Sequence, residues 1–83
     1  REAATAVPAS DQSLFEALRA WRRDQAASQH VPPYVIFHDR TLAEIAQSKP
    51  VSTHALGGVS GVGEGKLARY GEAVLTVVRG FVA

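Results

Sequence analysis

The chain has 83 residues, no cysteine and a formal net charge of +1 at pH 7. This length suits one small domain with a modest core, and the lack of cysteine excludes disulfides and thiolate metal sites. A charge this close to zero argues against a strong, purely electrostatic nucleic-acid binder, because the affinity of such proteins scales with the phosphates they neutralise.

The first ten residues, REAATAVPAS, are interpreted as a linker, and residues 11–83 as the domain. The chain begins with Arg rather than Met, which suggests a segment cut from a longer protein. No apolar run approaches the roughly 20 residues that a membrane-spanning helix needs, and no signal peptide is visible. We therefore expect no membrane partner.

The first helix is expected to begin near Ser10 or Asp11, which favour helix N-caps, with Ser13–Glu16 as a competing capping box. It is expected to end near Ser28 or Gln29. One face of this helix has amphipathic spacing and comprises Leu14, Leu18, Trp21 and Gln25, with Phe15 at its margin. Because Trp21 belongs to this face, we interpret it as a core residue and not as a platform for stacking bases.

A basic strip is expected beside that face, since Arg19, Arg22 and Arg23 lie at positions i, i+3 and i+4. Such a cluster is either a solvated helix face or a contact surface for nucleic acid.

The stretch VPPYVIF at residues 31–37 is a dense apolar segment. Pro32 and Pro33 fix φ, lack an N–H and push the residue before each of them towards extended backbone. We therefore expect an extended strap through the core and no helix across it. The residues expected to be buried there are Val35, Ile36 and Phe37. Tyr34 is the aromatic residue expected to face outward, because its hydroxyl prefers water.

A second helix is expected after the strap, with Asp39 as its N-cap or with Thr41–Glu44 as an alternative capping box. This helix must stop before Pro50. Its inward face is expected to comprise Leu42, Ile45 and Ala46. A third, short helix is expected over 53–56, capped by Ser52 and ended by two glycines.

The histidines carry no metal-ligand pattern. They stand at His30, His38 and His54, and these spacings match no known offset between metal ligands. We therefore predict neither a metal site nor a cofactor.

The stretch LGGVSGVGEGK at 56–66 indicates a tight hairpin between two helices. Gly61 and Gly63 would let the backbone turn sharply, while Val59 and Val62 would fill the core. The free N–H groups that open the next helix are able to meet a phosphate, with Lys66 and Arg69 on one side of its first turns. The alternative is a packing hairpin with no ligand.

The last helix follows this hairpin. Its broad apolar face comprises Leu67, Tyr70, Gly71, Val74, Leu75, Val78 and either Phe81 or Val82. Gly71 lowers helix propensity and is expected to mark a close contact between helices. Four helices, one strap and no strand pattern predict an all-α bundle of four to five helices.

The proline-rich stretch through Asp39, Thr41 and Leu42, followed by Gly61-Val62-Gly63, Lys66 and Tyr70-Gly71, resembles the HRDC domain. The resemblance runs from about residue 14 to residue 82. HRDC domains follow the motor of RecQ-type DNA helicases and the nuclease core of ribonuclease D, and the form seen here is most similar to that of bacterial RecQ helicases. The turn before the last helix also resembles the helix-hairpin-helix signature of many DNA-binding proteins.

The resemblance implies a non-catalytic domain that tunes how its parent helicase, an intracellular enzyme of the cytoplasm or nucleoid in a bacterium, engages DNA. The resemblance implies weak contact with single strands or junctions for Tyr34, Lys66, Arg22 and Arg23. Arg19 of the basic strip and Arg69 beside Lys66 are further candidates from the sequence pattern, with Gly61 and Gly63 supplying the hairpin backbone. The chain departs from the family in being less cationic, with alanines at 17 and 20 and Glu64 at the hairpin. These departures favour an alternative, in which the domain docks on the helicase core, a sister domain or a partner protein. An independent enzyme is the third hypothesis, and no nucleophile, base and orienting group can be assembled for it from the sequence.

Overall fold

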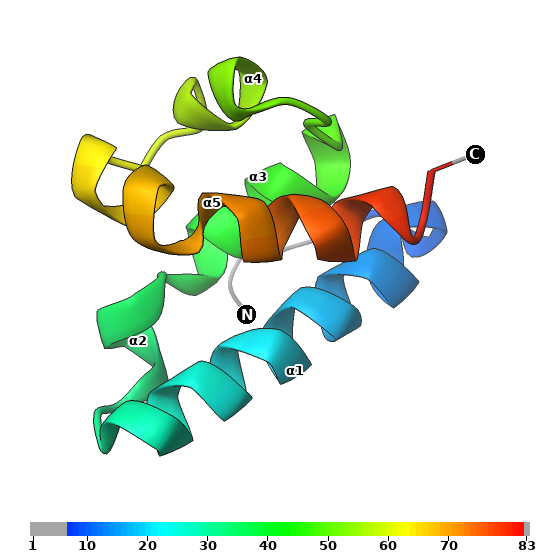
Figure 1. The fold of residues 1–83 in the computed structure, drawn as a ribbon. Helices are drawn as coiled ribbons and strands as arrows, with labels where there is room; N and C mark the ends of the chain where they lie inside the picture. Colours follow the sequence, from blue (N-terminus) through cyan, green and yellow to red (C-terminus); the bar gives the residue numbers. More distant parts are fainter. Residues whose placement is uncertain (1–6, 83) are drawn as a thin grey trace.

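The computed structural model describes residues 7–82, which contain five α-helices, one short 3₁₀ turn and no strand (Figure 1). The elements are η2 (Ala9–Asp11), α1 (Gln12–Gln29), α2 (Pro33–Ile36), α3 (Asp39–Ser48), α4 (Thr53–Gly57) and α5 (Glu64–Arg79). The predicted all-α class is confirmed. Residues 1–6, most of the predicted linker, lie outside the described residues, so the linker boundary stays a prediction.

The long helix α1 lies at the centre of the packing. It packs against α2, α3 and α5, and α4 packs on α5. In Figure 1, α5 crosses above α1, α3 lies behind them, and α2 sits beside the last turns of α1. The turn of chain between α1 and α3 is therefore held at one end of the bundle.

The core lies where α1, α3 and α5 meet. Its largest fully buried side chains are Phe37, Leu14, Leu18, Ile36, Leu42, Ile45, Leu56, Leu75, Val74 and Val78. Trp21 is half-buried, and its ring centroid lies 6.1 Å from that of Phe37 and 5.6 Å from that of Tyr70. Trp21 is thus part of an aromatic cluster against the core, as expected.

The predicted extended strap is wrong for its middle part. Pro33 is the first residue of α2, a single helical turn, and Pro32 before it has the extended ψ of 149° that is usual for an N-cap. Proline suits a first helical position because the N–H that it lacks has no partner there in any helix. The turn buries Ile36 and rotates Val35 outward, so the predicted burial of Val35, which is 43% exposed, is also wrong.

The ends of the helices confirm some of the predicted caps and boundaries and contradict others. α1 ends at Gln29 as expected, and α4 is capped by Ser52, whose hydroxyl accepts a 3.1 Å hydrogen bond from the Ala55 N–H. For α3 both proposed caps are wrong, because His38 is the N-cap residue and makes no side-chain cap. The Thr41 hydroxyl instead donates to the Ser60 carbonyl at 3.1 Å and ties α3 to the segment before α5.

The hairpin before α5 turns at Gly61. Its φ is +92°, and a Cβ there would lie 2.2 Å from the Thr41 hydroxyl oxygen. Val59 and Val62 are buried, as predicted. The expectation of a tight site at Gly63 is wrong, since its φ is −81° and a Cβ would meet nothing within 4 Å.

The last helix buries most of its predicted apolar face. Val82 packs against the core while Phe81 is 47% exposed, which decides between the two end positions. A Cβ on Gly71 would lie 3.3 Å from Leu67 of the same helix and 4.0 Å from Leu56 of α4. Because 4.0 Å is an ordinary contact distance, the expected close contact between helices is not found at Gly71.

We predict that Phe37→Ala lowers the free energy of unfolding by about 3–5 kcal/mol, a large part of what a small domain has. Phe37 is 2% exposed and contacts two other aromatic rings, so truncation leaves a cavity. Urea denaturation followed by circular dichroism measures the loss. Phe81→Ala is the control and should shift stability little. An unchanged midpoint for Phe37→Ala would show that the core is assigned wrongly.

The two hairpin glycines should respond differently to alanine. Gly61→Ala should destabilise the domain by about 1–3 kcal/mol, because alanine is strained at positive φ and its methyl group clashes with Thr41. Gly63→Ala should cost less than about 1 kcal/mol, because a Cβ there meets nothing and only the preference of an N-cap for glycine over alanine is lost. Thermal melts of the two variants check this, and equal melting temperatures would contradict it.

Candidate nucleic-acid interface

Tyr34 is the most exposed large apolar side chain of the described residues, at 61%. It stands on α2 directly after two prolines, whose fixed φ leaves the turn little freedom. The Tyr34 and His38 rings are nearly parallel, with centroids 6.1 Å apart and planes inclined by 21°. The predicted outward orientation of Tyr34 is confirmed.

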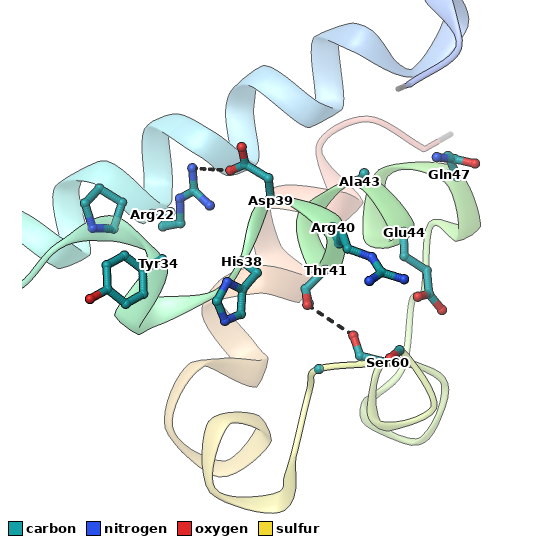
Figure 2. A pocket seen from close by; sticks show the side chains of 12 residues that line it. Arg22, Tyr34, His38, Asp39, Arg40, Thr41, Ala43, Glu44, Gln47 and Ser60 are labelled. Atoms are coloured by element: carbon teal, nitrogen blue, oxygen red, sulfur yellow. Dashed lines mark hydrogen bonds and ion pairs between the residues drawn. The ribbon is translucent and has the colours of Figure 1, made fainter. Parts of the chain in front are cut away.

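A groove of about 1000 Å³ opens beside this ring pair. Figure 2 shows Tyr34 and His38 at one end of it and Arg40 and Glu44 further along α3. Ser60 and Gly61 line the opposite wall. The hairpin before α5 and the turn α2 thus border the same surface, although they lie far apart in the sequence.

Arg22 forms the floor of the groove and is buried, with 7% of its surface exposed. Its guanidinium donates to the Phe37 carbonyl at 2.9 Å and pairs with an Asp39 carboxylate oxygen at 2.7 Å (Figure 2). Its Nε is buried with no hydrogen-bond partner in the described structure. The predicted exposed basic strip is therefore wrong for Arg22, because a side chain at this position points towards α2 and α3.

The other two arginines of α1 are exposed. Arg19 makes a 3.6 Å ion pair with Glu16 one turn away, and its guanidinium carbon lies 5.7 Å from the centroid of the Phe15 ring. Arg23 is exposed on the same helix as the buried Arg22. An exposed ion pair such as Arg19–Glu16 contributes little stability, so Arg19 is able to exchange Glu16 for another anion. Arg23 is exposed and is able to meet an anion directly.

Lys66 lies in the first turns of α5 but points to α2. Its ammonium donates to the Val35 carbonyl at 2.8 Å and to the Ile36 carbonyl at 2.7 Å. It also lies 5.4 Å from the centroid of the Phe37 ring. Lys66 therefore connects the helix after the hairpin to the turn that carries Tyr34.

Arg69, the second cation on this side of α5, turns to the end of α1. It donates to the Gln29 side-chain oxygen at 3.2 Å and lies 5.4 Å from the centroid of the Tyr70 ring. The Gln29 amide also donates to the Tyr70 hydroxyl at 2.9 Å. Arg69 is exposed, but these contacts hold it against α1.

The HRDC domain family model matches residues 11–78, most of the chain. This chain belongs to the HRDC domain family. The ATP-dependent DNA helicase RecQ of Bacillus subtilis is 42% identical over 78 residues, which are 94% of this chain and 13% of that helicase. The ATP-dependent DNA helicase UvrD2 of Mycobacterium tuberculosis is 41% identical over 80 residues, 96% of this chain and 11% of that protein.

The solved structure of D. radiodurans RecQ HRDC domain 3 has the same fold. It superposes with a TM-score of 0.81 at 31% identity, over 84% of this chain and 92% of that one. The chain therefore spans about the length of that single domain, and only a small part of the helicases that it matches.

The HRDC structure adds two groove residues that the sequence analysis did not assign to the interface, His38 and Arg40. The four-residue spacing of Tyr34 and His38 was the available signal, but the predicted strap placed no helical turn between them. Arg40 is exposed near the start of α3, and no local sequence signal distinguishes it from a solvated arginine. His38 and Arg40 line the groove because they lie where the turn α2 ends and α3 begins.

We predict that Arg22→Ala lowers the free energy of unfolding of this HRDC domain by about 1.5–3 kcal/mol, because a charge-assisted hydrogen bond is lost and the Phe37 carbonyl is left unpaired. Arg23→Ala, its exposed neighbour, is the matched control and should stay within about 0.5 kcal/mol of wild type. Urea titrations of the two variants make the comparison. Equal losses would show that Arg22 has no special structural role.

Proposed function

We propose that this HRDC domain is a non-catalytic accessory module of an ATP-dependent DNA helicase, and that it contacts unpaired DNA through the surface around Tyr34. The exposed Tyr34 ring beside the groove carries the proposal. Aromatic rings presented on a rigid element are what proteins use to stack single-stranded bases without reading sequence. The relatives named DNA helicases support the choice of parent enzyme.

Binding should be weak. The exposed cations nearest the ring pair are few, Arg40 within the groove being one, and the carboxylates of Asp39 and Glu44 line the same groove. We expect a dissociation constant around the ~10⁻⁴–10⁻⁶ M of non-specific binding, for a single strand or for the unpaired arms of a junction. An intracellular location with the parent helicase belongs to this proposal. No helix in residues 7–82 is long and apolar enough to span a membrane.

A second candidate function is docking on the helicase core or on another domain of the same chain. It is favoured by a separate exposed patch, where Val51 and Phe81 are both about half exposed. The Arg79 guanidinium reaches the Val51 carbonyl at 3.5 Å and links the end of α5 to the segment before α4. This patch lies at the end of α5 remote from Lys66 and Tyr34.

The test is a titration of the domain with labelled single-stranded, duplex and junction DNA. Tyr34→Ala should weaken single-strand binding by about tenfold, because one stacked base contributes roughly 1–3 kcal/mol. Tyr34→Phe keeps the ring and should bind as wild type does. Phe81→Ala removes an exposed aromatic ring elsewhere and is the matched control.

Two outcomes would decide against the DNA proposal. One is equal affinity of Tyr34→Ala and wild type for single strands. The other is no binding by the domain below millimolar concentration, together with altered DNA binding when Phe81→Ala is placed in the full-length helicase. The second outcome would favour docking through the patch of Val51 and Phe81.

A further inference from the structure

The carbonyl groups that end α2 have no helical partners, because α2 is only one turn long. Two cations from other helices satisfy them. Lys66 of α5 donates to the carbonyls of Val35 and Ile36, and Arg22 of α1 donates to that of Phe37. Three consecutive carbonyls are thus held by side chains that are 31, 30 and 15 positions away in the sequence.

Two backbone hydrogen bonds connect the turn to the residues at its ends. The Val35 N–H donates to the Pro32 carbonyl at 3.0 Å, and the Phe37 N–H donates to the Pro33 carbonyl at a longer 3.4 Å. In the sequence, Tyr34 lies between Pro33, whose carbonyl accepts one of these bonds, and Val35, whose carbonyl accepts a bond from Lys66. The backbone on the carboxyl side of Tyr34 is therefore held by donors from outside the turn.

The same contacts leave Lys66 poorly placed to bind a phosphate. Two of the three N–H donors of its ammonium are engaged with carbonyls, and the charge lies 5.4 Å from the centroid of the Phe37 ring. Moving the ammonium to a phosphate would leave both carbonyls without these bonds. A lysine after a glycine hairpin resembles a phosphate contact in the sequence, but here its partners are backbone oxygens.

The charges around the ring pair are also balanced. Arg22 is paired with Asp39, and the groove further holds the cation Arg40 and the anion Glu44. A groove with opposite charges in equal number attracts a phosphate backbone weakly. The uncharged faces of unpaired bases fit this surface better than phosphates do.

We propose that Lys66 is a positioning residue, which holds the α2 turn so that Tyr34 is presented to unpaired bases, and that it makes no contact with phosphate. This inference rests on the proposed single-strand binding by Tyr34. It assigns Lys66 an effect on DNA affinity that does not depend on salt.

The experiment measures single-strand affinity at several salt concentrations for wild type, Lys66→Met and Lys66→Arg, each alone and combined with Tyr34→Ala. Lys66→Met should weaken binding by about three- to tenfold, a part of the contribution of one stacked base. Its slope of log affinity against log salt should equal that of wild type. Lys66→Arg should restore affinity, because a guanidinium is also able to donate to two carbonyls. In the Tyr34→Ala background, Lys66→Met should have no further effect.

A slope lowered by about 0.7 in Lys66→Met, the value of one lost phosphate contact on a single strand, would overturn the inference. An unchanged affinity, or a loss that persists in the Tyr34→Ala background, would also overturn it. If the proposed single-strand binding by Tyr34 is itself wrong, Tyr34→Ala alone binds single strands as wild type does. That result distinguishes failure of the proposed function from failure of the inference about Lys66.

A measurement on the wild-type protein is independent of how the variants fold. The ¹⁵N resonance of the Lys66 ammonium should keep its chemical shift when a single strand is added to saturation. A shift as large as that of a lysine bound to phosphate would contradict the positioning role.

Discussion

The carbonyls of Val35, Ile36 and Phe37 end a helical turn that is too short to satisfy them, and cations from α1 and α5 reach them instead. The bond from Arg22 to the Phe37 carbonyl is buried, and a buried carbonyl left without a donor costs about 1–3 kcal/mol, which is large for a domain of this size. The contacts also join three elements that are distant in the sequence. They hold the α2 turn, which carries Tyr34 beside the groove, against α1 and α5.

These contacts reduce the number of positive charges on the domain that are available to bind an anion. Of its nine lysines and arginines, Arg22 and Lys66 are engaged with backbone carbonyls, and Lys49 pairs with Asp11 and donates to the Ala46 carbonyl at 3.1 Å. Arg69 is held by Gln29. A count of cations in the sequence therefore overstates the number available to phosphates. A surface that works by stacking on one ring is compatible with the low net charge of this chain.

Weak binding would be sufficient for a domain that is tethered to a larger enzyme. The chain spans 13% of the RecQ helicase and 11% of the UvrD2 helicase that it matches. When a second site on the same protein already holds the DNA, the effective concentration of DNA at a tethered module reaches the millimolar range. Under that condition the proposed weak binding would be enough to lengthen the time that a tethered enzyme stays on a strand. The relatives include helicases of two names, so the same module serves in more than one kind of parent.

The sequence by itself determined α1, α3, α4 and α5 and much of the core. Helical spacing in α1, α3 and α5 and the serine cap of α4 are local signals, and positive φ at Gly61 follows from a short-range turn pattern. These features depend on residues within a few positions of one another, which is why they can be predicted. The exposure of Tyr34 is also favoured locally, by its own hydroxyl and by the two prolines before it, but the turn on which it stands is held by donors from α1 and α5.

Only the tertiary structure decided the form of residues 31–37 and the roles of the cations. Two prolines allow either an extended strap or the first turn of a helix, and the choice depends on donors supplied by Arg22 and Lys66 from other helices. The burial of Arg22 beside the exposed Arg23 depends on where α2 and α3 pack. A basic residue on a helix has the same local pattern whether its partner is a phosphate or a distant carbonyl, because that partner is brought near only by the fold.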